Sequence, residues 1–512
     1  MKNLIKRGVG LFKIGNALRN IRKSTDDETR ERAQHYLMEL LGKSRGLPTK
    51  VGQFMTMDDE KDSLREALSI ATPPMSMEEF TGQLSLIYDK PYDSIFSSIE
   101  MKGKPASLGQ VHKAVLRDGR QVAVKVQYPG IAHSVEAEMK LFGWMPKAGP
   151  VSKWGFNLEG YRAAFHENFL RELDYLCEAE QQARYQEMCR PLDDVVIPNV
   201  VKELTRHNVL VQEWREGMSL DEAEKLSDSQ KLGLGRAILR HYFHMLFRHG
   251  YVHSDPNPAN FAFCVNQGEG AVVVYDFGSI LKINNTIRLG LIRTILAVSG
   301  REAVDPASCM ASLGFDVDKL EDLRPTLPAL LQVLFDPFTT EAPYHAKDWR
   351  ISERFDGIVG DLKWWFRSAA PPELIFLMRT LHGMTSMLKR LDVALPWRFI
   401  FNQLCRDLFP QAQAFKLPSI PKVEGAASGF HEMSTLLKIH VVKTNGNVVD
   451  LSMPSRVVED LEAIIDPPVM EAIRKNKIDL DGIQKRARKT GFIPQDLFEI
   501  SDSERQVRVW LE

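Results

Sequence analysis

The chain has 512 residues, 44% of them hydrophobic, and its 66 basic and 67 acidic side chains leave a net charge of -1. This length favours two to four packed units with real cores. The balanced charge argues against a nucleic acid as partner of the whole surface. The five cysteines lack metal-ligand or C-x-x-C spacing, which favours buried thiols in a reducing compartment. Because no uncharged apolar run approaches the roughly 18 residues of a membrane-spanning helix, we expect a cytoplasmic protein, either free or peripheral on a membrane.

Residues 1–25 carry seven basic side chains and no acidic one. An apolar stripe at helical spacing runs through them, formed by Leu11, Ile14, Leu18 and Ile21. A basic amphipathic helix of this kind binds an anionic membrane surface, or it docks its stripe on the rest of the protein as a cap. The sequence leaves both interpretations open.

The pattern changes from helical to stranded between residues 30 and 130. Helical periodicity up to about residue 100 is interrupted by "GLPTKVGQ" and by "ATPPMSMEEF", where Ser76 and Glu79 have the spacing of a capping box. Apolar and polar residues then alternate on both sides of Asp118-Gly119. This dipeptide between alternating segments predicts a β-hairpin.

Helices dominate the middle of the chain. Residues 157–190 read as one helix with an apolar stripe of Phe165, Phe169, Leu173 and Leu176. Buried strands are expected at 208–214 and in "AVVVYDFGS", separated by a helical region from 220 to about 250, and residues 285–415 read as all helical.

A change of composition to Pro, Gly, Ala and Ser marks residues 416–430 as a linker. Beyond it, "KIHVVKTNGNVVDLSM" predicts a second hairpin that turns at Asn445-Gly446. Short helices and a strand-like tail, "RQVRVWLE", follow. The end of the chain therefore reads as a separate module.

The stretch "VHSDPNPANF", residues 252–261, concentrates chemically useful side chains. Asp-Pro-Asn-Pro is good turn chemistry and needs no ligand to explain it. However, Asp255 and Asn260 have the spacing of the kinase catalytic loop, His253 stands where that motif has its histidine, and Asp276 opens "DFG" sixteen residues after Asn260.

Two further residues complete the order of a phosphoryl-transfer site. Lys125, in "VAVK", lies on the second strand of the first hairpin, and Glu178 lies on the helix that follows. Either residue alone is most simply a solvated side chain. Phosphoryl transfer requires a cation that binds phosphate, a carboxylate that holds this cation, two metal ligands and a base. Lys125, Glu178, the Asp-x4-Asn pair and the aspartate of DFG follow one another along the chain in the order expected for these parts.

These motifs resemble those of the UbiB-type atypical kinases, the aarF-domain family. The resemblance rests on "KVGQ" (50–53), "PASLGQVH" (105–112), "VAVKVQYPG" (122–130), "ELDYLCEA" (172–179), "HSDPNPAN" (253–260) and "DFG" (276–278). The chain differs from ordinary protein kinases because it has no G-x-G-x-x-G and no A-P-E segment after Asp276.

The resemblance implies roles for individual residues. Lys125 would contact the α/β-phosphates and Glu178 would orient it; Asp276 and Asn260 would hold Mg²⁺, and Asp255 would be the catalytic base. The alanine-rich phosphate loop of the family corresponds to residues 104–107, where Lys104 and Pro105 replace two expected alanines. The expected nucleotide contacts are Ala106, Ser107, Gly109, Gln110, Lys125, Glu213 and Trp214.

A regulatory set also follows from the resemblance: Lys50 and Gln53 of the K-x-G-Q segment, with Glu172 and Asp174. Residues two apart on a straight helix point about 200° apart, so Glu172 and Asp174 cannot face the same lysine unless the helix ends or bends there. We expect Glu172 and Glu178 to have different partners. The simpler alternative makes Lys50 a solvent-facing residue at a helix start.

The resemblance implies an α+β, atypical protein-kinase-like bilobal fold with an N-terminal helical extension and a small C-terminal α+β module. The expected parts are an extension (1–60), an N-lobe (61–215), a helical C-lobe (216–415), a linker (416–430) and the module (431–512). The leading interpretation is an ATP- or ADP- and Mg²⁺-binding atypical kinase or ATPase that supports isoprenoid-quinone or lipid metabolism. The alternative is a nucleotide-binding pseudoenzyme that serves as a scaffold for partner enzymes.

Overall fold

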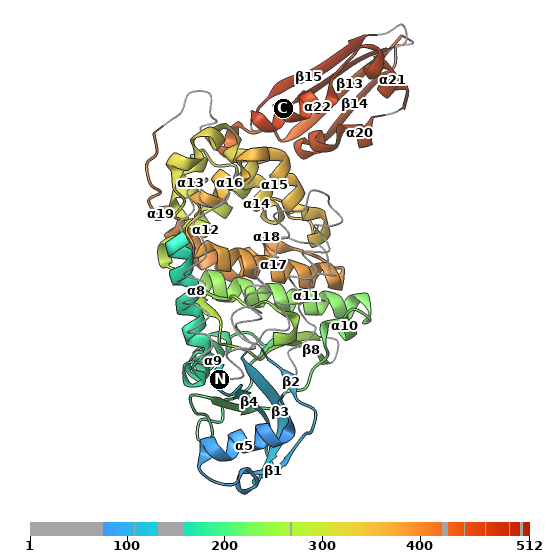
Figure 1. The fold of residues 1–512 in the computed structure, drawn as a ribbon. Helices are drawn as coiled ribbons and strands as arrows, with labels where there is room; N and C mark the ends of the chain where they lie inside the picture. Colours follow the sequence, from blue (N-terminus) through green and yellow to red (C-terminus); the bar gives the residue numbers. More distant parts are fainter. Residues whose placement is uncertain are drawn as a thin grey trace, which may run out of the picture.

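The computed structural model describes residues 75–131, 158–421 and 429–512, apart from 107, 267–268, 445, 466, 491 and 502–504. A small sheet lobe lies at one end of the molecule, a larger helical lobe in the middle and an α+β module at the other end (Figure 1). The α+β architecture expected from the sequence is confirmed. Among the described helices, none combines the length and apolar character needed to cross a bilayer.

The sheet lobe is an antiparallel sheet in the order β1-β3-β4-β6, with the short β2 beside β3. Its strands are β1 (Phe96–Ile99), β2 (Lys104–Pro105), β3 (Gly109–Leu116), β4 (Gln121–Gln127) and β6 (Val209–Glu213). The predicted hairpin is confirmed: Gly119 takes a positive φ of 89° in the turn between β3 and β4. Helix α5 (Met77–Tyr88), which begins at the predicted Ser76–Glu79 capping box, packs Phe80 and Leu84 into the core of this lobe.

The predicted single helix over 157–190 is wrong, because two helices occupy this stretch. Helix α8 (Leu158–Glu172) ends before Leu173, and α9 (Tyr175–Cys189) begins at Asp174, which accepts a hydrogen bond from the Leu176 N–H. Of the expected apolar stripe, Leu173 packs partly buried against the core of the sheet lobe and Leu176 is partly buried, while the side chains of Phe165 and Phe169 lie outside the described residues. The buried positions of α9 are instead Tyr175, Glu178, Gln182, Tyr185 and Cys189. Three polar side chains of this face are hydrogen-bonded: Glu178 to Lys125, Gln182 to Gln212 and Tyr185 to His241.

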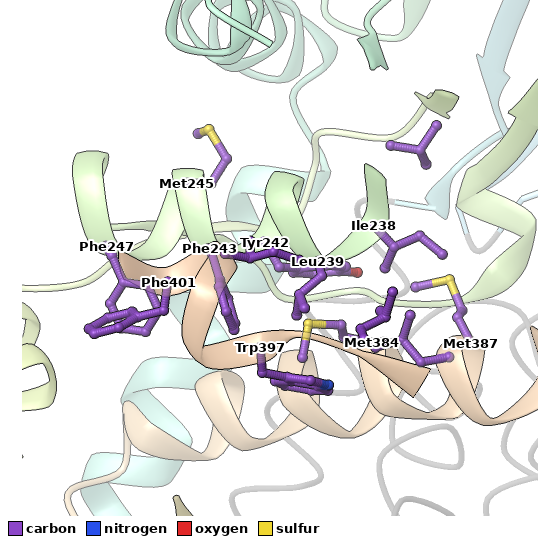
Figure 2. Close-up of a cluster of buried hydrophobic side chains, with 14 of the residues drawn as sticks. Ile238, Leu239, Tyr242, Phe243, Met245, Phe247, Met384, Met387, Trp397 and Phe401 are labelled. Atoms are coloured by element: carbon purple, nitrogen blue, oxygen red, sulfur yellow. The ribbon is translucent and has the colours of Figure 1, made fainter. Parts of the chain in front are cut away.

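The helical lobe is built around α11 (Asp228–Phe243) and the π-helical turn that continues it (His244–His249). Figure 2 shows the centre of its core, where side chains of α11, α17 (Leu374–Leu391) and α18 (Trp397–Cys405) meet, among them Ile238, Phe243, Met384, Met387, Trp397 and Phe401. The remaining helices are α10 (Leu220–Ala223), α12 (Asn285–Gly300), α13 (Pro306–Ser312), α14 (Leu327–Leu334), α15 (Ile351–Val359), α16 (Lys363–Ala369) and α19 (Phe409–Ala414). Residues 285–415 are helical as predicted, except for one short pair of strands, β11 (Tyr344–His345) and β12 (Ala394–Leu395).

Short strands line the junction of the two lobes. The buried strand predicted before "DFG" is β9 (Glu269–Val274), which pairs with β8 (Phe261–Asn266) and with β5 (Val195–Val196). Beside them, β7 (Tyr251–His253) pairs with β10 (Ile280–Lys282). These two pairings bring the stretch around Asp255 next to the stretch around Asp276.

The C-terminal module is a four-stranded antiparallel sheet with three short helices. Its strands, in the order β14-β13-β16-β15, are β13 (Leu436–Lys443), β14 (Val448–Pro454), β15 (Gln495–Ser501) and β16 (Arg505–Leu511), and its helices are α20 (Leu461–Ile464), α21 (Pro467–Lys475) and α22 (Leu480–Lys489). The predicted second hairpin and terminal strand are confirmed. The module shares one apolar core with α13 and α14, and Arg354 of α15 pairs with Glu459 at 3.2 Å. The chain division at 416–430 stays a prediction.

A buried histidine in α11 makes the fold sensitive to acid. His241 is fully buried, its Nε2 lies 2.8 Å from the Tyr185 hydroxyl, and burial lowers its pKa to about 3. Unfolding therefore takes up one more proton between pH 6.5 and 3, so stability falls as the pH falls through this range. His241→Gln should reduce the pH dependence of the unfolding free energy by up to about 1.4 kcal/mol per pH unit between pH 6 and 4.5.

Urea unfolding of the parent and the variant at several pH values measures this slope. Between pH 7 and 8 the two profiles should be parallel, because the imidazole is neutral in both folded and unfolded chains. Equal slopes below pH 6 would contradict the assignment of the acid sensitivity to His241.

Candidate active site

Three segments distant in sequence meet at the Lys125 side chain. The Nζ atom of Lys125, on β4, lies 2.8 and 3.0 Å from the two carboxylate oxygens of Glu178, on α9. It also lies 2.8 Å from Oδ2 of Asp276, just beyond β9. Lys125 is 13% exposed and Glu178 only 1%. The sequence-predicted pairing of Lys125 with Glu178 is thus present in the structure, with Asp276 as a second carboxylate partner.

Burial and charge act against each other in this cluster. Burial alone would lower the pKa of Lys125, but Asp276 and Glu178 together raise it well above its ordinary value. Burial raises the pKa of Glu178 to about 7, although Lys125 opposes that rise. The backbone N–H of Phe277 also donates to Glu178, at 3.4 Å. The ammonium therefore stays charged, held between the buried Glu178 carboxylate and the partly exposed Asp276 carboxylate.

The stretch 253–260 is a supported loop and not a simple surface turn. His253 and Ser254 are fully buried, the Ser254 hydroxyl donates to the Ser279 carbonyl at 2.9 Å, and His253 Nε2 lies 2.5 Å from the Asp276 carbonyl. Asn260 Nδ2 donates to the Asp255 carbonyl at 3.0 Å. The Tyr275 N–H donates to the Asn260 carbonyl, so the loop is hydrogen-bonded at both of its ends to the segment that carries Asp276.

Helix α17 holds the same loop from the other side. Arg379 Nη2 lies 2.7 Å from Oδ1 of Asp255, and both side chains are 10% exposed. The Thr380 hydroxyl donates to the His253 carbonyl at 3.0 Å. Gly383 lies so close to the loop that a Cβ atom there would be 2.1 Å from Cβ of Pro256. Sequence reasoning missed these three residues because Arg379 is 124 positions from Asp255 and no local pattern links them.

The expected nucleotide contacts lie at two places. Gly109 at the start of β3 shares a strand face with Lys125, since Val111, two residues on, pairs with Lys125. The Gln110 side chain is on the opposite face, where its Oε1 accepts from the Met75 N–H at 2.6 Å. The Ala106 N–H donates to the Gly109 carbonyl at 2.8 Å. Ser107 lies outside the described residues.

Glu213 and Trp214 end β6, at the passage between the lobes. The Glu213 carboxylate accepts from the Asn199 amide at 3.0 Å and pairs with Arg215 at 2.8 Å. The Trp214 ring lies 5.0 Å from the ammonium of Lys113 on β3. The structure therefore places Trp214 beneath the sheet, on the side of Lys125.

The expected regulatory acids have separate environments, because the helix does end between them. Glu172 is the buried last residue of α8, and its Cγ lies 3.3 Å from where a Cβ on Gly278 would be. Asp174 caps α9 and lies 3.0 Å from His207 Nδ1. Asp174 precedes the first residue of α9 and so is not on the buried helix face that carries Glu178. Lys50, Gln53 and the basic segment 1–25 lie outside the described residues.

Residues 67–306 match the family of ABC1 atypical kinase-like domains. This part of the chain is an ABC1 atypical kinase-like domain. The chain is 28% identical over 373 residues to an uncharacterized chloroplastic aarF domain-containing protein kinase of Arabidopsis thaliana, covering 70% of this chain and 50% of that protein. It is 24% identical over 388 residues to the mitochondrial atypical kinase COQ8 of Saccharomyces cerevisiae, covering 73% of this chain and 75% of COQ8. The chain spans about half the length of several of the curated relatives that it matches, the Arabidopsis protein among them.

A solved structure supports the fold of the ABC1 domain. The Rv3197–erythromycin complex of Mycobacterium tuberculosis has a TM-score of 0.50 and 23% sequence identity to this chain. The match covers 74% of this chain and 96% of the mycobacterial chain. This likeness concerns the fold alone.

The residues that the structure describes offer few protein ligands to a metal ion. Within the described parts of the chain, no three His, Cys, Asp or Glu side chains group as a metal cage. Asp276 and Asn260 lie next to each other, since the Tyr275 N–H donates to the Asn260 carbonyl at 3.0 Å. Because the Asn260 amide nitrogen is used by Asp255, its oxygen is left for other contacts. One carboxylate and one amide oxygen suit Mg²⁺, which takes few protein ligands and completes its shell with phosphate and water.

The contact between α17 and the loop over residues 253–260 can be tested at Gly383. Gly383→Ala should overpack Pro256, whose ring cannot rotate away, and lower stability by about 1–3 kcal/mol. Differential scanning fluorimetry should show a melting temperature lower by several degrees.

Gly357→Ala is the matched control. Gly357 is an exposed position in α15 where a Cβ atom would find its nearest neighbour at 3.6 Å. This variant should be unchanged or slightly more stable, since alanine favours a helix. If both variants melt like the parent, α17 does not press on the loop as inferred.

Proposed function

We propose that this protein is a nucleotide- and Mg²⁺-dependent atypical kinase or ATPase of the UbiB type. One observation carries the proposal: the buried Lys125 ammonium lies between Glu178 and Asp276, beside the loop that carries Asp255 and Asn260. These are the parts that phosphoryl transfer requires, gathered from four separate segments.

The contacts suggest how each side chain would act. A bound phosphate would draw the Lys125 ammonium away from Asp276, while Glu178, held by the Phe277 N–H, would keep Lys125 in position. Asp276 would then be released, and with the Asn260 amide oxygen it would hold Mg²⁺. When bound, that ion neutralises the charge that develops on the phosphate oxygens.

Asp255 occupies the position of the proton acceptor. Arg379 balances the charge of its buried carboxylate and fixes the orientation of that group. Asp255 would accept the proton of an attacking hydroxyl or water. The phosphoryl acceptor would be water or a small molecule of isoprenoid-quinone or lipid metabolism. This part of the proposal rests on the family resemblance.

The second candidate is a nucleotide-bound scaffold without chemistry. The pairing of Lys125 with both carboxylates and of Asp255 with Arg379 would suit a site that only binds. The scaffold candidate does not explain why Lys125, Asp255, Asn260 and Asp276 are all present, because a protein that only binds nucleotide has no need of all four. Membrane contact through residues 1–25 remains a proposal for either function.

Asp276→Asn tests the binding site. A neutral amide is a poor replacement for a carboxylate as a hard-cation ligand, so Mg²⁺ with ATP or ADP should raise the melting temperature of the variant much less than that of the parent. Asp228→Asn, at a fully exposed side chain, controls for the loss of one charge. If nucleotide with Mg²⁺ stabilises Asp276→Asn as much as the parent, the assignment of the site is wrong.

Lys125→Met tests for chemistry. The variant should still fold, because Glu178 can become protonated near neutral pH when its cation is removed. It should release phosphate from ATP at least 100-fold more slowly than the parent, since the phosphates lose their oriented cation. A parent protein that binds nucleotide and shows neither phosphate release nor autophosphorylation, with and without anionic liposomes, would favour the scaffold.

A further inference from the structure

The Tyr175 side chain has a hydroxyl that the protein buries without a partner. Tyr175 is the first residue of α9, three positions before Glu178, and is 1% exposed. Its hydroxyl has no hydrogen-bond partner among the residues that the structure describes. Buried hydroxyls in folded proteins are nearly always bonded, so this one needs an explanation.

The hydroxyl lies among charged groups and yet is bonded to none of them. Lys125, Glu178, Asp276 and Glu172 all influence its ionisation electrostatically. The Lys125 ammonium lies 5.0 Å from the centre of the Tyr175 ring, in a cation–π arrangement. The Glu178 and Asp276 carboxylates are instead directed toward the Lys125 ammonium, which both contact at 2.8 Å.

The hydroxyl reaches the beginning of β3. A Cβ atom on Gly109 would lie 2.9 Å from the Tyr175 hydroxyl oxygen and 2.2 Å from the Val126 carbonyl oxygen. Any side chain at Gly109 would therefore collide with both groups. Gly109 is where the stretch 104–107, expected to cover phosphates, enters the strand. The Tyr175 hydroxyl is thus aimed at Gly109, on the strand face that carries Lys125.

The chemistry of the hydroxyl suits an anionic oxygen. Burial raises the pKa of Tyr175, and the surrounding carboxylates raise it further against the opposing effect of Lys125. The group therefore stays protonated and can donate a hydrogen bond. An acceptor brought to Lys125 by its own negative charge would find the Tyr175 donor already in place.

We propose that the Tyr175 hydroxyl donates to a β- or γ-phosphate oxygen of a bound nucleotide and so selects di- and triphosphates over monophosphates. This inference rests on the proposed nucleotide-binding function. Tyr175 is then a binding residue for the phosphate chain, in addition to Lys125.

Tyr175→Phe provides the test, since it keeps the ring beside Lys125 and removes only the hydroxyl. Isothermal titration calorimetry with AMP, ADP and ATP, each with Mg²⁺, measures the affinities. We expect ADP and ATP to bind about tenfold to a hundredfold more weakly than to the parent, as for a lost hydrogen bond to a charged group. AMP should bind equally to both proteins. Without nucleotide, the variant should be as stable as the parent or more stable, because no bond is lost.

Tyr344→Phe is the control. Tyr344 is also buried, but its hydroxyl donates to Asp336 at 2.6 Å, in a part of the helical lobe that lacks the Lys125 cluster. This variant should be less stable than the parent. Its ADP and AMP affinities should differ by the same factor as those of the parent.

The outcomes separate the two proposals. If the parent binds none of the three nucleotides, the proposed function fails and the role of Tyr175 fails with it. If the parent binds ADP and Tyr175→Phe binds it equally well, only the role of Tyr175 is overturned. The same holds if the affinities of the variant for AMP and for ADP fall by the same factor. A variant that is strongly destabilised without nucleotide also overturns it, because the hydroxyl would then have a partner in the free protein.

Discussion

The structure depends on one buried cation. Lys125 is held on the inner face of the sheet by carboxylates from α9 and from the end of β9. A buried ammonium is costly unless it is paired and hydrogen-bonded, and each carboxylate is costly without the ammonium. The side chains of Lys125, Glu178 and Asp276 therefore hold the sheet lobe, α9 and the helical lobe in one arrangement. This constraint also explains why the buried face of α9 is polar, with Glu178 and Gln182 where an apolar stripe would be expected.

The loop over residues 253–260 is held in shape by contacts from outside its own sequence. Its backbone is tied to the Asp276 segment through His253 and Ser254, and its carboxylate is paired with Arg379. Gly383 allows α17 to lie against Pro256 without a clash. The loop is thus held in place by a helix from a later part of the chain. The ABC1 domain accordingly draws its support from beyond the matched residues 67–306.

The C-terminal module extends this support further. Leu437 and Val458 of the module belong to the same apolar core as Leu330 of α14. Arg354 joins Asp336 of the helical lobe, at 2.7 Å, to Glu459 of the module. Because a shared apolar core and a partly buried ion pair are costly to separate, the module and the helical lobe form one continuous packed unit. The edge strand β14 of the module carries three exposed apolar side chains, Val448, Val449 and Leu451.

Local chemistry was sufficient to predict much of this protein. The hairpins at Gly119 and in β13–β14, the capping box of α5, and the strand before Asp276 follow from turn and strand patterns that act over a few residues. The spacing of Asp255 and Asn260 and the order of Lys125, Glu178 and Asp276 identified the candidate site, and the structure brings Lys125, Glu178 and Asp276 together.

Only the tertiary structure decided which faces are buried and which distant groups meet. The break between α8 and α9 was not predicted, because the periodicity of 157–190 continues through a capping aspartate whose partners are set by packing. Arg379, Gly383 and Tyr175 could not be found, since their significance lies in contacts with Asp255, Pro256 and Gly109 across long stretches of chain. Turns and spacings are local properties that a sequence displays directly. Pairings across a core are decided by the desolvation of charged and polar groups, which exists only when the whole fold has excluded water.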